Sequence, residues 1–144
     1  MSHAAPALDL ASRRRVLLVD DDALDRHRTA HSLSHGGYEV VAVATVATAL
    51  EQLSGLSYDA VIAETCMGDG TGFDVFHAAR ERQADLPVVF LGSDSRLPAR
   101  IGAIRYVCRS ADPAPLLAAL IEVCGGHRSP DHPVEPPRVT ALAS

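Results

Sequence analysis

Short apolar runs recur at fairly even intervals along the chain, and each is about the length of one β-strand. The five runs lie within RVLLVDDD (15–22), EVVAVA (39–44), DAVIAE (59–64), PVVFLG (87–92) and IRYVCR (104–109). Runs that are apolar at nearly every residue are typical of strands buried on both faces, as in parallel sheets. The pattern therefore predicts five buried parallel strands.

Amphipathic stretches separate these strands, with apolar positions at helical spacing. The predicted helices with the clearest patterns cover residues 45–55, 72–83 and 112–126. The last of them starts with Asp112 as a candidate N-cap and Pro113 at the first helical position, and Gly125 is expected to end it. Strands that alternate with helices indicate an α/β protein with a doubly wound sheet.

Chemically distinctive residues stand where the predicted strands end. The ends hold Asp20 and Asp21 after the first strand, Glu64 on the third, Gly92 and Ser93 on the fourth, and Arg109 on the fifth. In open α/β sheets, sites form outside the carboxyl ends of the strands, where the strand order reverses. The sequence therefore predicts an acidic crevice that also holds one arginine.

Length and composition exclude several classes of protein. A chain of 144 residues is the size of one domain, and its 13 basic and 18 acidic residues show no cluster typical of nucleic-acid binding. No apolar run is long enough to span a membrane, and the first residues lack the charge order of a secretory signal. The three cysteines have neither metal-type nor redox-type spacing, which favours a reducing compartment. We therefore expect a cytoplasmic protein without nucleic-acid or membrane partners.

The chain is expected to divide into a mobile segment over residues 1–14, one domain over residues 15–125, and a proline-rich mobile tail over residues 126–144. No output domain is expected after residue 125. Any output is then expected to come through a protein partner or through self-association.

Four stretches resemble, in order and spacing, the receiver domain of bacterial two-component response regulators: VLLVDDD, YDAVIAETCMGDGTGFDVF, LPVVFLGSD and GAIRYVCR. The resemblance covers about residues 14–124 and implies a flavodoxin-like sheet with strand order 2-1-3-4-5. It also implies a pocket in which acids after strand one hold Mg²⁺ and an Asp after strand three accepts a phosphoryl group. Strand five starts early for this family and Pro98 precedes it, so we expect a shortened fourth helix.

The sequence keeps some positions of that pocket and changes others. The matching positions hold Asp20 and Asp21 for the metal-binding acids, Glu64 for the acceptor Asp, Gly92 for a Thr or Ser, Arg109 for a Lys, and Tyr106 for the aromatic switch residue. Ser93 is a candidate to replace the missing hydroxyl, and Tyr106 can also be read as an ordinary strand residue. The chain contains no lysine, so no neighbouring lysine can replace the lost one.

Glu64 is expected to be a poor phosphoacceptor, because its extra methylene moves the carboxylate and a misplacement of about 1 Å can cost roughly a hundredfold in rate. Glu64 either imitates the charge of a phosphate permanently or belongs to a retired pocket, and both interpretations remain open. Because a guanidinium can bind a carboxylate through two nitrogens, we expect Arg109 to pair with Glu64 or Asp21.

The resemblance also implies a possible Mg²⁺ site. Its ligands are the side chains of Asp20, Asp21 and Glu64 and the backbone carbonyl of Cys66. We expect that no cofactor is required, since Asp20 and Asp21 can instead cap a helix or hold a loop. Asp22 is expected to be a solvated or capping residue.

The first helix carries two unusual features. His27, His31 and His35 share one face, which we interpret as a solvated stripe rather than a metal site. Positions that are usually apolar in the family are polar here, namely Asp25, Arg28, Thr29 and Ser32. The helix is loosely packed, rotated, or in contact with a partner chain, and the sequence does not decide between these.

The favoured hypothesis is a stand-alone atypical receiver that is not an enzyme and acts through contacts with a signalling kinase, an effector or a second copy, independently of phosphorylation. One alternative is a Mg²⁺-dependent phosphoacceptor that retains some activity. A haloacid-dehalogenase-type phosphatase is a weaker alternative, because Asp20 and Asp22 form a D-x-D motif but Leu24 replaces the expected Thr or Val.

Overall fold

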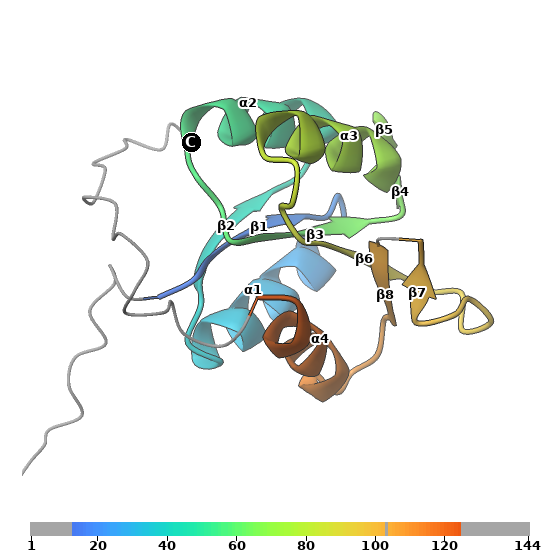
Figure 1. Cartoon of the computed structure of the whole chain (residues 1–144). Helices are drawn as coiled ribbons and strands as arrows, with labels where there is room; N and C mark the ends of the chain where they lie inside the picture. Colours follow the sequence, from blue (N-terminus) through green and yellow to red (C-terminus); the bar gives the residue numbers. More distant parts are fainter. Residues whose placement is uncertain (1–12, 103, 125–144) are drawn as a thin grey trace, which may run out of the picture.

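The computed structural model describes residues 13–102 and 104–124, and five parallel strands form most of its main sheet. They are β1 (Arg15–Val19), β2 (Glu39–Val43), β3 (Ala60–Glu64), β6 (Val88–Gly92) and β8 (Ile104–Cys108). The sheet order is β2-β1-β3-β6-β8-β7, so the five predicted strands lie in the order 2-1-3-4-5, as expected (Figure 1). The predictions for residues 1–12 and 125–144, including the stop at Gly125 and the mobile tail, lie outside the described residues.

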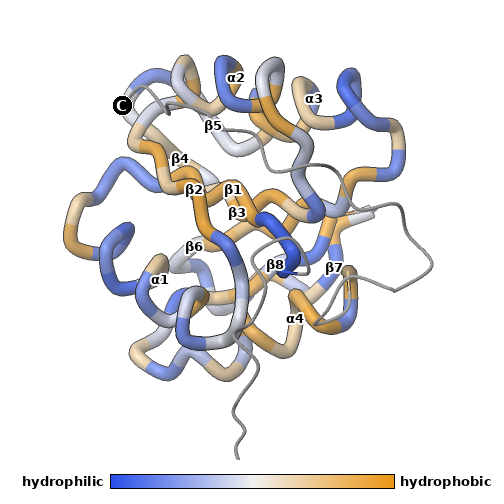
Figure 2. Tube along the Cα trace, turned by 90° about the vertical axis from the view of Figure 1, so that its left-hand side faces the viewer, coloured by the Kyte–Doolittle hydropathy of each residue, from blue (hydrophilic) through white to orange (hydrophobic). Residues whose placement is uncertain are grey.

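Helices cover both faces of the sheet (Figure 1). One face carries α2 (Val46–Gly55) and α3 (Gly72–Arg82), and the other carries α1 (Ala23–His35) and α4 (Ala114–Cys124). Successive strand residues enter opposite cores: Leu17 belongs to the cluster under α2 and α3, whereas Val16 belongs to the cluster under α1 and α4. Figure 2 shows the hydrophobic strands enclosed between these two layers.

Local capping fixes where the helices begin. The Thr45 hydroxyl accepts a hydrogen bond from the Thr48 N–H at 3.0 Å, and Thr71 forms a capping box with Asp74 at the start of α3. Asp22 caps α1, as expected, by accepting from the Asp25 N–H at 2.9 Å. The Asp112 carboxylate accepts from the Ala114 N–H at 2.9 Å. Helix α4 therefore begins at Ala114, one residue later than predicted.

The expected shortened fourth helix is wrong, because no residue described between β6 and β8 is helical. Instead, β7 (Arg100–Ile101) pairs antiparallel with β8 and adds a sixth strand at the sheet edge. Pro98 lacks the N–H that a helix needs, and Asp94 accepts from the Arg96 N–H in a local turn. Gly102 has φ +61°, which suits the tight connection into β8.

A small hairpin of β4 (Cys66–Met67) and β5 (Gly70–Thr71) follows β3 and was not expected from the sequence. In α1 only Leu33 is buried, so this helix buries little of its surface against the sheet. The stripe of His27, His31 and His35 is exposed. No helix within residues 13–102 or 104–124 is both long and apolar enough to cross a membrane.

Candidate functional site

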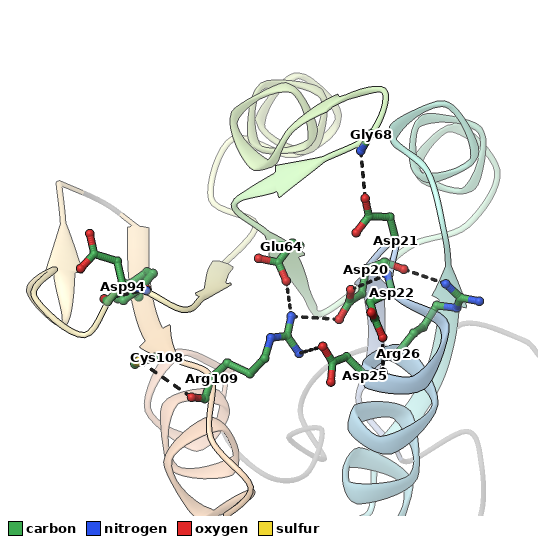
Figure 3. Close-up of polar contacts among 11 residues, drawn as sticks. Asp20, Asp21, Asp22, Asp25, Arg26, Glu64, Gly68, Asp94, Cys108 and Arg109 are labelled. Atoms are coloured by element: carbon green, nitrogen blue, oxygen red, sulfur yellow. Dashed lines mark hydrogen bonds and ion pairs between the residues drawn. The ribbon is translucent and has the colours of Figure 1, made fainter.

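Three parallel strands bring charged side chains to one edge of the sheet. Asp20 follows β1, Glu64 is the last residue of β3, and Arg109 follows β8, and Figure 3 shows the three side chains converging. β1 and β3 are neighbours in the sheet, and β6 lies between β3 and β8. All four strands are parallel, so their carboxyl ends lie at the same edge of the sheet. The structure therefore brings together the carboxylates and the arginine that the sequence predicted at this edge.

The Arg109 guanidinium connects the acidic groups. Its Nη2 donates to Asp20 Oδ2 at 3.0 Å and also to Glu64 Oε2, and its Nη1 lies 3.7 Å from Asp25 Oδ2 (Figure 3). The predicted pairing with Glu64 is confirmed. Arg109 thus contacts carboxylates from three separate parts of the chain.

The alternative pairing of Arg109 with Asp21 is wrong. Asp21 is exposed, and its Oδ2 accepts a hydrogen bond from the Gly68 N–H at 2.9 Å. Consecutive side chains of an extended segment point in opposite directions, so Asp20 faces Arg109 while Asp21 faces the loop after β3. Asp21 thus holds that loop, which is one of the two structural roles considered for the pair.

The charges of this cluster interact strongly, because the side chains are largely buried from water. The Asp20 side chain is 1% exposed, and those of Glu64 and Arg109 are 17% and 21% exposed. Burial raises the pKa of Glu64 above its usual value, although the hydrogen bond and charge of Arg109 oppose this shift. Burial lowers the pKa of Arg109, but its pairing with Glu64 and Asp20 outweighs burial and leaves the pKa raised. Arg109 therefore stays charged.

Further hydrogen bonds hold Asp20 in place. Its Oδ1 accepts from the Asp22 N–H at 3.0 Å, and its backbone carbonyl accepts from Arg26 Nη1 at 2.9 Å. The sequence did not single out Arg26, and only its position one turn after Asp22 could have suggested this role. With both carboxylate oxygens engaged, Asp20 is fixed in its orientation toward Arg109.

Gly92 lies against Tyr106, which is buried. A Cβ atom at Gly92 would lie 2.9 Å from the Tyr106 hydroxyl and 2.9 Å from Thr65 Oγ1. The Tyr106 hydroxyl donates to the Asp94 carbonyl at 2.9 Å and accepts from the Asp94 N–H at 3.0 Å. Tyr106 is 2% exposed, and burial raises its pKa. Its hydroxyl thus fills the space beside Gly92, where a Thr or Ser side chain does not fit.

Ser93 is exposed, whereas Thr65 borders the site. Little in the sequence points to Thr65 or Asp94, because Asp94 acts through its hydrogen bonds to the Tyr106 hydroxyl and Thr65 through its position beside Gly92. The hydroxyl of Tyr106, the predicted switch residue, is therefore held by two hydrogen bonds, one donated and one accepted.

The arrangement does not fit a Mg²⁺ ion held by Asp20, Asp21, Glu64 and the Cys66 carbonyl. Mg²⁺ requires oxygen ligands in a near-octahedral shell. Here the Arg109 guanidinium lies between Asp20 and Glu64, and Asp21 faces Gly68. Within the described part of the chain, no three His, Cys, Asp or Glu side chains are arranged to hold a metal ion.

Comparisons with known proteins agree with this fold. Residues 16–120 match the model of the response regulator receiver domain. The acid tolerance regulatory protein ActR of Sinorhizobium medicae is 28% identical over 145 residues, which covers 96% of this chain and 75% of the relative. The two-component response regulator ORR12 of Oryza sativa subsp. japonica is 37% identical over 93 residues, covering 62% and 76% of the two chains.

Solved structures of response regulators are also similar to this chain. A response regulator receiver protein from Sinorhizobium medicae matches with a TM-score of 0.71 and 25% identity, over 78% of this chain and 94% of that chain. A chain in the crystal structure of histidine kinase ThkA with the response regulator protein TrrA matches with a TM-score of 0.68 and 26% identity, over 76% and 97%. The chain therefore belongs to the response regulator receiver domain family of two-component signalling.

Proposed function

We propose that this chain is an atypical receiver that works independently of phosphorylation and signals through protein contacts in the cytoplasm, without being an enzyme. The observation that carries the proposal is the Arg109 guanidinium, which binds both Asp20 and Glu64. A phosphoacceptor pocket needs free carboxylates to hold Mg²⁺ and a free acceptor oxygen for in-line attack. Here both Mg²⁺ binding and phosphoryl transfer compete with the ion pairs that Arg109 makes with these carboxylates.

The chemistry of Glu64 supports this proposal. Glu64 is one methylene longer than the Asp of family members, and phosphoryl transfer depends on the positions of the attacking and leaving oxygens. One Glu64 oxygen is already bonded to Arg109. A phosphoryl group here would carry negative charge next to Asp20, whose side chain is only 1% exposed. Without a metal ion, this repulsion disfavours transfer.

The fixed position of Tyr106 supports the same conclusion. Both hydrogen bonds of its hydroxyl go to the Asp94 backbone, and the adjacent Gly92 has no hydroxyl that could respond to a phosphate. The surface near Tyr106 therefore holds one conformation without an added group at Glu64. We propose that a protein partner recognises this conformation, in line with the kinase complex of the similar TrrA structure.

Phosphodonor treatment tests the proposal directly. We expect intact-mass spectra with acetyl phosphate and Mg²⁺ to show no phosphoryl adduct, and amide NMR spectra with beryllofluoride and Mg²⁺ to show no saturable shifts at the ends of β1, β3 and β8. The double variant Glu64→Asp/Arg109→Lys restores the acceptor and cation types of the family and serves as the matched control. A stoichiometric adduct on Glu64 of the wild type would favour the phosphoacceptor alternative.

Partner capture separates the two interpretations of Glu64. If its charge imitates a phosphate, wild-type protein should retain more partner than Glu64→Gln does, while Glu64→Asp should retain an intermediate amount. Equal recovery by all three forms would instead support a retired pocket. Arg82→Gln, a change on the exposed side of α3, controls for an unspecific loss of surface charge.

A further inference from the structure

The polar positions of α1 meet at a cavity beside the acidic site. The cavity has a volume of about 350 Å³ and lies between α1 and the segment that joins β8 to α4. Helices α1 and α4 lie on the same face of the sheet (Figure 1). All four unexpectedly polar residues of the first helix line it, namely Asp25, Arg28, Thr29 and Ser32.

The cavity combines an apolar floor with a polar wall. Leu91, Val107 and Leu116 form part of its lining and are 3%, 6% and 7% exposed. Thr29 and Ser32 add polar residues to the lining from α1. Ligand sites typically have volumes of about 300–1,000 Å³, an apolar lining and a few polar groups that orient the ligand. The cavity matches this description.

The lining carries two carboxylates, Asp25 and Asp112, and two guanidiniums, Arg28 and Arg109, so its formal charge is balanced. Asp25 lies 3.7 Å from Arg109, and Asp112 accepts the Ala114 N–H, so both carboxylates already have partners. Arg109 is held by Asp20 and Glu64. In the described part of the chain, Arg28 makes no hydrogen bond or ion pair, which leaves one cation available at the rim. An arginine binds carboxylates and phosphates through charge-assisted hydrogen bonds.

Polar residues under a helix also weaken its packing, because they replace apolar contacts with the sheet. Only Leu33 of α1 is buried, so the helix gives up burial on the side where the cavity lies. A bound ligand would contribute apolar contacts to this gap. We propose that the cavity binds a small organic anion, a carboxylate or phosphate monoester with an apolar body, whose charge pairs with Arg28.

Amide NMR titration tests this proposal, with benzoate and phenyl phosphate as probes. Both probes should give saturable shifts in the segment from Val107 to Leu116 and in α1. Benzyl alcohol lacks the charge, and inorganic phosphate lacks the apolar body, so each should bind at least tenfold more weakly. Absence of saturable shifts with both anionic probes would overturn the proposal, and so would equal binding of inorganic phosphate.

Two variants and one control assign the contacts. Arg28→Gln changes an exposed side chain and should weaken probe binding at least tenfold, which is the loss expected for one charge-assisted hydrogen bond. Ser32→Leu should fill the cavity and abolish binding. Arg82→Gln, on the opposite face, should bind like the wild type. Unchanged binding by Arg28→Gln would refute a small-anion site.

Discussion

Arg109 performs at the residue level the task that a bound cation performs in many acidic sites. It neutralises carboxylates that are too buried to be solvated by water, since Asp20 is 1% and Glu64 is 17% exposed. A buried charge that loses its partner is expensive, because neither water nor another group replaces the lost interaction. The stability of the strand ends should therefore depend on this one side chain.

Replacing Arg109 with Ala should lower the free energy of unfolding by about 3–5 kcal/mol at neutral pH, as expected when one partner of a buried ion pair is removed. Urea unfolding measures the change, and the chain is short enough for two-state behaviour. Arg109→Lys should retain part of the stability, because lysine keeps the charge but loses the planar fork. Arg82→Ala should change the value by no more than about 0.5 kcal/mol. A similarly small loss for Arg109→Ala would show that water solvates the carboxylates.

A methyl group at position 92 should destabilise the protein, because the added Cβ meets Thr65 Oγ1 and the Tyr106 hydroxyl, each at 2.9 Å. Overpacking of this kind costs about 1–3 kcal/mol. Gly55→Ala is the matched control, since a Cβ there meets nothing within 4 Å, and it should be neutral or stabilising. Urea unfolding of both variants gives the comparison.

The Tyr106→Leu variant tests whether Tyr106 causes the loss of stability expected for Gly92→Ala. In the Tyr106→Leu background, Gly92→Ala should lose less stability than in the wild type, because the hydroxyl that opposes the methyl group is gone. An unchanged cost in this double-mutant cycle would assign the clash to Thr65 alone. It would also remove the steric reason for a glycine beside Tyr106.

The start of α2 depends on a distant carboxylate. Asp69, in the loop between β4 and β5, accepts from the Val46 N–H at 2.9 Å and the Ala47 N–H at 3.2 Å. These hydrogen bonds lower the pKa of Asp69 below its usual value of 3.8. An anion at the N-terminus of a helix also interacts favourably with the helix dipole. The small β4–β5 hairpin therefore has a structural role in holding α2.

Asp69→Asn should reduce stability in a pH-dependent way. The folded state lowers the pKa of this carboxyl, so its contribution is fully present above pH 3.8 and is lost as the pH falls through the lower folded value. The difference in unfolding free energy between wild type and Asp69→Asn should therefore be constant near neutrality and shrink in acid. Glu51→Gln, on an exposed site of the same helix, is the control. A difference that persists unchanged at the lowest pH would contradict this role.

The sequence predicted the five parallel strands because each is apolar on both faces, and it predicted the helices with clear caps. It failed between β6 and β8, where β7 replaces the expected fourth helix. A segment of few apolar residues interrupted by Pro98 has weak preferences, and pairing with β8 decided its structure. Local sequence does not record such tertiary pairing.

For the candidate site too, some features could be predicted from the sequence and others depend on the folded structure. Residues at strand ends were predictable, because parallel strands bring their carboxyl ends to one edge. Their exact partners were not, since the choice of Asp20 over Asp21 depends on the direction of each side chain. The contacts of Thr65 and Asp94 with the Gly92 region depend on how Tyr106 packs, which requires the folded sheet.

At the level of the whole molecule, the acidic edge and the α1 cavity are linked by shared residues. Asp25 and Arg109 belong to both, with their side chains 3.7 Å apart. Arg109 also ties β8 to the ends of β1 and β3. Any ligand that requires the carboxylates must therefore displace an interaction that stabilises the whole sheet edge.

This competition makes the magnesium dependence of global stability a test of the whole site. A ligand that binds only the folded state adds about 2.7 kcal/mol at 100 times its Kd. Wild-type protein should gain no thermal stability from millimolar MgCl₂ relative to NaCl of matched ionic strength, because Arg109 already neutralises Asp20 and Glu64. Arg109→Ala leaves these carboxylates without a cation, so its Tm should rise with MgCl₂. A magnesium-dependent rise in the wild type would show that the ion displaces Arg109, and the pocket would then remain open to phosphoryl chemistry.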